Sequence, residues 1–273
     1  MEHISKAQIK FIRSLQQKKY RDESGMFVAE GSKCIEELSR SFELVLRVSS
    51  SNASATEIAQ MSGLRTPQGE IAVFKKRAAE ERHNAPQDNR LVLALDDIQD
   101  PGNLGTIIRT CDWYGIEDIY CSLHTADCYN PKVVQATMGA LARVRVHYVD
   151  LPQWLAESLR RRESGASSYP IYGTLLDGRN MYEESAIPNK AQGIIIMGNE
   201  GNGISEEVRR LITHPLYIPS YKQSEGEVVE SLNVSIATAI ILAEFRREQR
   251  EPPESGSLLV ASSEYRVHFF QYH

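Results

Sequence analysis

The sequence predicts an α/β protein: a parallel sheet with helices on both faces, preceded by a small α/β unit. From residue 91 onward, short apolar segments alternate with helical patterns, which is the order that builds parallel sheets. Residues 1–75 show a shorter alternation of the same kind. Between the two units, residues 76–90 are polar, charged and interrupted by Pro86, as is typical of a linker.

The first unit opens with a predicted helix. Ser5 and Gln8 form a capping-box pattern, and the apolar side chains between Ile9 and Leu15 recur on one helical face. Strands are predicted at "MFVAEG", "ELVLRV" and "EIAVFK", and further helices at "SKCIEELS" and "SATEIAQM". The polar face of the first helix and the residues after it form a basic surface that contains Lys6, Lys10, Arg13, Lys18, Lys19 and Arg21.

The second unit, residues 91–250, begins with "LVLAL", an apolar run typical of a strand buried on both faces. Further strands are predicted at "DIYC", "VRVHY", "PIYGTLL", "GIIIM" and "PLYIP". Helices are predicted between them at "NLGTIIRTCDWYG", "PKVVQATMGALA", "PQWLAESLRRR" and "SEEVRRLI". A long apolar helix from Ser231 to about Arg247 follows, and residues 251–273 form a tail without assigned structure.

The composition narrows the class of protein. A chain of 273 residues fits one large domain or two modest ones. Its net charge of −5 does not favour nucleic-acid binding, which would therefore depend on local patches of basic residues. The four cysteines lack metal-ligand spacing and a neighbouring histidine cluster, so we expect free thiols and no metal site. The polar N-terminus and the short longest apolar run, Ile236 to Ala243, predict a cytoplasmic protein without a membrane span.

Two predicted strands of the second unit lead into polar turns that open helices. "DDIQDPGNLGTIIRT" turns tightly at Pro101 and carries Asn103 and Arg109, and "LYIPSYKQSEGEVVESLNVS" carries Ser231 and Asn233. Each segment alone fits an ordinary helix cap with a solvated charge. Open α/β sheets bind ligands at the carboxyl ends of their strands, so both segments are also candidates for a binding site.

A third such segment, "IIIMGNEGNGIS", is rich in glycine but does not fit the common phosphate-binding motifs. Its glycines at 198, 201 and 203 do not match G-x-G-x-x-G, and no acidic residue ends a following strand at the right place. The absence of G-K-[ST] excludes a P-loop. A plain nucleotide-binding protein is therefore disfavoured, and the bare backbone around Glu200 indicates another ligand.

The three segments together resemble a known family. "DPGNLGTIIRT", "IIIMGNEGNGIS" and "IPSYKQSEGEVVESLNVSIATAIILAE" are similar to motifs of the SpoU (TrmH-like) class of the SPOUT superfamily, the RNA 2′-O-ribose methyltransferases. The resemblance covers about residues 91–247. The first unit, with "VAEG" and "TPQGEIAVF", resembles the ribosomal-protein-like substrate-binding domain that often precedes this catalytic domain. The resemblance implies a deep C-terminal trefoil knot, S-adenosylmethionine as cofactor, and a homodimer with its active site at the subunit interface.

The resemblance also implies roles for individual residues. It points to Arg109 as catalytic and places Glu200 close to it, where a carboxylate–guanidinium pair would hold the arginine. Asn103 and Asn233 would orient the target ribose and Arg109, with support from Ser231. Arg109 would either accept the proton of the 2′-hydroxyl with help from a phosphate, or stay charged and stabilise the developing alkoxide, and the sequence leaves both open.

The cofactor contacts implied by the resemblance come largely from the main chain, because glycines let backbone approach a ligand closely. The segment "SYKQSEGEVVE" borders this site and is longer than is usual in the family, so the shape of this loop is not predicted. The expected cofactor-binding residues are Thr174, Gly198, Gly201, Ile218 and Leu232.

The predicted activity is transfer of a methyl group from S-adenosylmethionine to a ribose 2′-hydroxyl of structured RNA. Ribosomal RNA is favoured because the first unit is of the type common among enzymes that act on it, and transfer RNA stays open. The alternative is a non-catalytic RNA-binding member of the same fold. The basic surface from Lys6 to Arg21 is the candidate RNA-binding surface, and residues 1–75 the substrate-binding domain.

Overall fold

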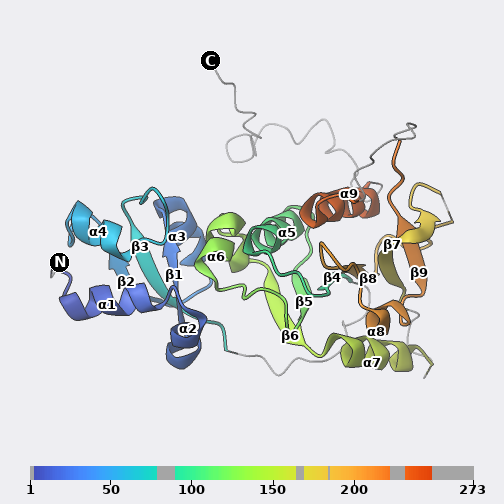
Figure 1. The fold of residues 1–273 in the computed structure, drawn as a ribbon, viewed down its shortest axis with the longest axis horizontal. Helices are drawn as coiled ribbons and strands as arrows, with labels where there is room; N and C mark the ends of the chain where they lie inside the picture. Colours follow the sequence, from blue (N-terminus) through green and yellow to red (C-terminus); the bar gives the residue numbers. More distant parts are fainter. Residues whose placement is uncertain (1–2, 79–89, 164–168, 184, 222–230, 248–273) are drawn as a thin grey trace, which may run out of the picture.

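The computed structural model describes residues 3–78, 90–163, 169–183, 185–221 and 231–247. The expected tail at 251–273, most of the expected linker and the long loop at 222–230 lie outside these ranges. Within them the chain forms two units that lie side by side, the N-terminal unit at the left of Figure 1 and the C-terminal unit at the right. No helix in the described ranges is long and apolar enough to cross a membrane.

The N-terminal unit is a small antiparallel sheet with helices packed on it. The sheet has the order β1-β3-β2, with β1 at Met26–Glu30, β2 at Leu44–Val48 and β3 at Ile71–Lys75. The helices are α1 (Lys6–Ser14), α2 (Lys18–Ser24), α3 (Ser32–Leu38) and α4 (Ala55–Met61). The capping box predicted at Ser5 and Gln8 is present at the start of α1, which buries Ile9 and Ile12.

The C-terminal unit is a parallel sheet of six strands in the order β6-β5-β4-β8-β7-β9, as the alternation of strands and helices predicts. The strands are β4 (Leu91–Leu95), β5 (Asp118–Ser122), β6 (Arg145–Val149), β7 (Ile171–Asn180), β8 (Gly193–Met197) and β9 (His214–Tyr217). The helices are α5 (Pro101–Trp113), α6 (Pro131–Thr137), the 3-10 helix η1 (Ala140–Ala142), α7 (Leu151–Glu163), α8 (Glu206–Arg209) and α9 (Val234–Arg246).

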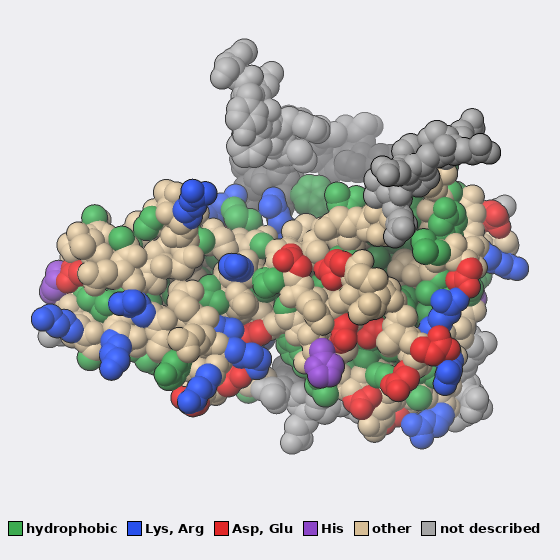
Figure 2. Space-filling model, viewed as in Figure 1, with side chains coloured by type: hydrophobic (Ala, Val, Ile, Leu, Met, Phe, Trp, Pro, Cys, Tyr) green, Lys and Arg blue, Asp and Glu red, His purple; other side chains and the backbone are tan. Residues whose placement is uncertain are grey.

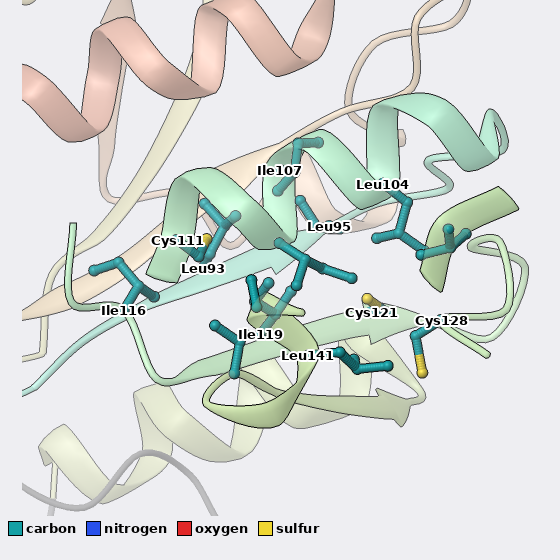
Figure 3. Packing of buried hydrophobic residues seen from close by; sticks show 14 of the residues in the cluster. Leu93, Leu95, Leu104, Ile107, Cys111, Ile116, Ile119, Cys121, Cys128 and Leu141 are labelled. Carbon is teal, nitrogen blue, oxygen red and sulfur yellow. The ribbon is translucent and has the colours of Figure 1, made fainter. Parts of the chain in front are cut away.

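Strand β4 explains why "LVLAL" contains no polar residue. Leu93 and Leu95 belong to the core under α5 and α9, whereas Val92 and Ala94 belong to a second core under α7 and α8. Helices cover both faces of the sheet (Figure 1), so both sets of alternating side chains are buried. Figure 3 shows Leu104, Ile107 and Cys111 of α5 directed at β4.

The trefoil knot implied by the resemblance stays a prediction. The chain between β9 and α9 includes residues 222–230, which lie outside the described ranges. In the described part, α9 packs against α5 on one face of the sheet. Asn233 caps α9 by accepting from the backbone N–H groups of Ser235 and Ile236, so the helix begins three residues later than Ser231, where the sequence predicted its start.

The two units share one continuous core, so their junction is not a simple linker. Phe27 and Phe42 of the N-terminal unit pack on Tyr129 of the C-terminal unit, with ring centroids 4.8 and 6.3 Å away. The expected linker at 76–90 is wrong at its start. Lys76 pairs with Asp22 at 2.7 Å, and Arg77 donates to the carbonyl oxygens of residues 142 and 144.

Arg21 is the side chain that ties the junction together, and its prediction as an RNA contact is wrong. Only 1% of the residue is exposed. Its Nη2 and Nε donate to Asp127 Oδ2 at 2.7 and 3.1 Å, across the junction. Its Nη1 donates to the carbonyl oxygens of Leu15 and Gln16, each at 2.9 Å, at the end of α1. A buried guanidinium engaged in four hydrogen bonds within the fold is a structural group.

The four cysteines are free, as the sequence predicted, and the structure shows that all four are buried. Burial raises the pKa of the Cys34 thiol to about 11 and that of Cys128 to about 12. A thiol whose pKa is raised in this way holds little thiolate at neutral pH, so it is a poor nucleophile.

We expect Arg21→Ala to lower the free energy of unfolding by about 3–5 kcal/mol, because it leaves a largely buried carboxylate and two carbonyl groups without their donor. Urea unfolding measures the change. The control is Arg210→Ala, which breaks an exposed pair with Glu206 on α8 and should change the free energy by less than about 1 kcal/mol. Equal effects of the two substitutions would contradict the structural role of Arg21.

Candidate active site

The three segments singled out in the sequence meet at one edge of the parallel sheet. β4 and β8 are paired in parallel with Leu95 opposite Met197, so the chain leaves both strands at the same level. β7 and β9 lie on the far side of β8 and point the same way. The loops after these four strands therefore converge, although they are far apart in the sequence.

A cavity of about 590 Å³ opens between β7 and the segments that follow β8 and β9. Apolar side chains such as Leu216, Val234 and Ala237 line part of it, and the backbone of residues 198–203 lines another part. Its volume lies in the range of roughly 300–1,000 Å³ that is usual for small-molecule sites. All five residues expected to bind the cofactor line this single cavity: Thr174, Gly198, Gly201, Ile218 and Leu232.

The glycine-rich segment forms a tight, internally bonded turn. The backbones of Asn199 and Gly203 exchange two hydrogen bonds, at 2.9 and 3.0 Å, and Gly203 adopts a φ of 69°. A Cβ atom on Gly198 would lie 2.4 Å from the carbonyl carbon of Gly203, so only glycine fits there. Bare backbone at this position is thus required by the turn itself, and it leaves peptide groups facing the cavity.

Asn199 holds this turn against the loop after β4, and the sequence analysis missed it. Its Oδ1 accepts from the backbone N–H of Gly201 at 2.8 Å, while its Nδ2 donates to the carbonyl oxygen of Asp97 at 2.7 Å. Asp97 has a φ of 59°, which is unusual for a residue with a side chain. The amide in "GNEGNG" was a visible signal, but its partner 102 residues away was not.

A chain of three polar side chains crosses the mouth of the site. Asn103 Nδ2 donates to Glu200 Oε1 at 2.7 Å, and Asn233 Nδ2 donates to Asn103 Oδ1 at 3.0 Å. Both polar atoms of the Asn103 amide are therefore used, which fixes its orientation. Three of the predicted catalytic residues are brought together in this way, and Ser231 lines the adjoining cavity.

Arg109 lies apart from this chain of side chains. It is exposed on α5 and does not line the cavity, and its side chain forms no hydrogen bond or ion pair with any residue in the described ranges. Glu200 contacts Asn103, and the expected pair between Glu200 and Arg109 is not formed within the described ranges. Nor do three or more potential metal ligands cluster anywhere in the described ranges.

Two family models match the chain. The SpoU rRNA Methylase family matches residues 90–243, and the MRM3-like substrate binding domain matches residues 6–82. The 23S rRNA (guanosine(2553)-2'-O)-methyltransferase RlmP of Bacillus subtilis is 29% identical over 262 residues, which cover 90% of this chain and 98% of that protein.

Solved structures give the same picture. A Porphyromonas gingivalis structure described as belonging to the TrmH family of RNA methyltransferases has a TM-score of 0.77 and 39% sequence identity to this chain. The match covers 89% of this chain and 98% of the Porphyromonas gingivalis chain. The AdoMet-bound rRNA methyltransferase of Sinorhizobium meliloti has a TM-score of 0.75 and 28% identity, and covers 92% of this chain and 99% of its own. Both matches include the two units.

We expect Gly198→Ala to destabilise the protein by about 1–3 kcal/mol, because the new methyl group overlaps backbone that cannot move without opening the turn. Thermal and urea unfolding measure the change. Gly201→Ala is the matched control, since a Cβ there would meet only Asn199 Oδ1 at 3.5 Å. A Gly198→Ala protein as stable as the Gly201→Ala protein would show that the turn is not tight.

Proposed function

Because the chain belongs to the SpoU rRNA methylase family, we propose that it transfers a methyl group from S-adenosylmethionine to a ribose 2′-hydroxyl of ribosomal RNA. The observation that carries the proposal is that two of the family segments line one cavity together with all five expected cofactor residues, while Asn103 of the third segment contacts Glu200 of that lining. Ribosomal RNA is favoured over transfer RNA because the relative from Bacillus subtilis, named for 23S rRNA, matches across both units. The reaction takes place in the cytoplasm, a compartment that suits free cysteines.

The cavity fits S-adenosylmethionine in its lining as well as its size. Leu216, Val234 and Ala237 offer an apolar wall for the adenine ring, and the peptide groups of residues 198–203 offer donors and acceptors for its polar edges. The Sinorhizobium meliloti structure, with the same fold at a TM-score of 0.75, holds AdoMet. When bound, the cofactor supplies an electrophilic methyl group on a sulfonium.

The fixed amides at the mouth of the cavity would position the ribose. Glu200 Oε1 is engaged by Asn103, which leaves Oε2 to accept from a ribose hydroxyl. Asn103 is held at both ends of its amide, so the carboxylate beside it is held as well. Such preorganisation contributes to rate by removing the need to align the 2′-oxygen during the reaction.

Arg109 completes the site in a homodimer. It is exposed and lies outside the cavity of its own subunit, so it is available to the cavity of a second copy. Apolar side chains on the packed helices α5 and α9 support such an interface, since Trp113 is 68% and Ile236 53% exposed. A guanidinium that keeps its charge stabilises the developing 2′-alkoxide, which we favour over the role of base.

The remaining basic surface, defined here as Lys6, Lys10, Arg13, Lys18 and Lys19, would bind the RNA backbone. All five side chains are exposed, and Figure 2 shows basic side chains over the N-terminal unit. Lys18 and Lys19 pair with acids one turn later, at 2.6 and 3.9 Å. The three cations of α1 have no acidic partner in the described ranges, so phosphate groups are the best remaining counterions.

We expect Arg109→Ala to lower methyl transfer to ribosomal RNA by at least 100-fold, in line with the loss of one group that stabilises transition-state charge, at roughly 2.7–4 kcal/mol. Binding of S-adenosylmethionine, measured by calorimetry, should change less than about twofold. Transfer is measured with a tritiated methyl donor, and Arg210→Ala serves as an exposed-arginine control. Transfer by the Arg109→Ala protein at the control rate would refute this assignment.

A further inference from the structure

A second cavity, here called the cleft, lies between the two units, away from the cofactor cavity. Its volume is about 230 Å³. The N-terminal unit contributes the end of α1, the end of β1 and the residues after α4, and the C-terminal unit contributes the starts of α5 and α6. The residues that matter below are Gln16, Glu30, Pro101, Lys132 and Gln135.

This cleft adjoins the chain of side chains at the active site. Pro101 lines it and is the first residue of α5, two positions before Asn103. Asn103 in turn contacts Glu200 at 2.7 Å. A nucleotide held in the cleft would therefore lie close to a ribose at Glu200.

The cleft presents polar groups that the fold leaves unused. Gln16 Nε2 is buried and has no hydrogen-bond partner in the described ranges, which is costly for an amide donor. The side chains of Lys132 and Gln135 form no ion pair or side-chain hydrogen bond there either. Glu30, only 4% exposed, accepts one hydrogen bond on each oxygen, from Ser62 Oγ at 2.6 Å and from the backbone N–H of Gly63 at 2.7 Å. Each of its oxygens keeps a lone pair.

The two walls of the cleft are fixed to each other. Arg21 donates to the carbonyl oxygen of Gln16 on one wall and pairs with Asp127 beside the other. The backbone of Asn130, which lines the second wall, donates to the carbonyl oxygen of Asp127 at 2.9 Å. A cleft held open by a buried ion pair is already formed before any ligand arrives, which lowers the cost of binding.

We propose that this cleft binds one unpaired nucleotide of the substrate RNA, next to the nucleotide that is methylated. The inference rests on the proposed function. Proteins read RNA sequence mainly from unstacked bases whose edges meet amide and carboxylate groups, and the glutamines and Glu30 supply these. Lys132 at the rim supplies a charge for the phosphate. The three cations of α1 recur at helical spacing, and Gln16 of the cleft follows the end of that helix.

The cleft thereby gives the enzyme a means of choosing its target. The cofactor cavity and the amides at its mouth contact a methyl donor and a ribose, which are the same at every nucleotide. A base held between the units is the part of the substrate that differs between sequences. The distance from this base to the methylated ribose is set by the rigid junction.

The test uses the fragment of ribosomal RNA that the full-length protein protects from ribonuclease, so that the RNA is chosen without reference to methylation. Each nucleotide of the protected site is replaced in turn by an abasic residue. Binding and methyl transfer are measured for the wild-type protein, for Gln135→Ala and Lys132→Ala, and for two matched exposed controls, Gln60→Ala on α4 and Lys33→Ala on α3.

We expect one abasic position beside the target to weaken binding by the wild-type and control proteins about tenfold. The Gln135→Ala protein should bind the intact RNA severalfold more weakly than the Gln60→Ala protein. Its RNA affinity should fall little further when that nucleotide is abasic, because the protein substitution and the abasic substitution remove the same contact. Lys132→Ala should likewise weaken binding relative to Lys33→Ala. Binding of S-adenosylmethionine should stay unchanged in all variants.

Additive losses for Gln135→Ala and the abasic substitution, or no sensitive abasic position, would overturn the proposal. If the proposed function is wrong, the wild-type protein will bind RNA without transferring a methyl group. In that case the binding measurements still decide whether the cleft holds a nucleotide. A protein that protects no RNA would overturn both.

Discussion

The parallel pairing of β4 with β8 is the constraint on which the rest of the site depends. It sets the loop after residue 95 beside the loop after residue 197, and three side-chain hydrogen bonds then cross between them. Asp96 Oδ2 accepts from the backbone N–H of Ser205, Asn199 donates to the carbonyl oxygen of residue 97, and Asn103 donates to Glu200. A shift in this register would separate all three pairs at once. The contacts that hold the glycine-rich turn and Glu200 against the loop after β4 are therefore consequences of one strand pairing.

A second constraint acts at the junction of the units, where a core and a buried ion pair are shared. Arg21 and Asp127 fix the end of α1 against the loop before α6, so the N-terminal unit keeps one position relative to the sheet. Arg143 adds a surface contribution by pairing with both Glu37 of α3 and Asp112 of α5. A rigidly attached substrate-binding domain holds its RNA contacts at a fixed distance from the active site. A domain on a flexible tether does not.

Most strands and several site residues could be predicted from the sequence. Contacts between residues far apart in the chain could not be predicted, because no local pattern reveals them. Apolar runs predicted the strands because burial on both faces leaves no other composition, as in β4. The glycine at 198 and the amides at 103 and 233 were found because the family motifs contain them. The burial of Arg21 was not predictable, since a lysine- and arginine-rich helix face gives no sign of a carboxylate 106 residues away. The helix predicted through "PKVVQATMGALA" ends at Thr137, because Met138 and Gly139 both adopt a positive φ, of 51° and 91°. Gly139 packs against Glu37 of α3. That contact also joins the two units, so the local sequence around Gly139 does not reveal it.

Methylation mapping can decide whether these loops bind a methyl donor and direct it to a sugar hydroxyl, as we propose. Total RNA is incubated with the protein and labelled S-adenosylmethionine, and ribose methylation is mapped by resistance to alkaline cleavage. We expect label on a 2′-oxygen at a defined position of ribosomal RNA. Label on a base, or no label on any RNA, would contradict it.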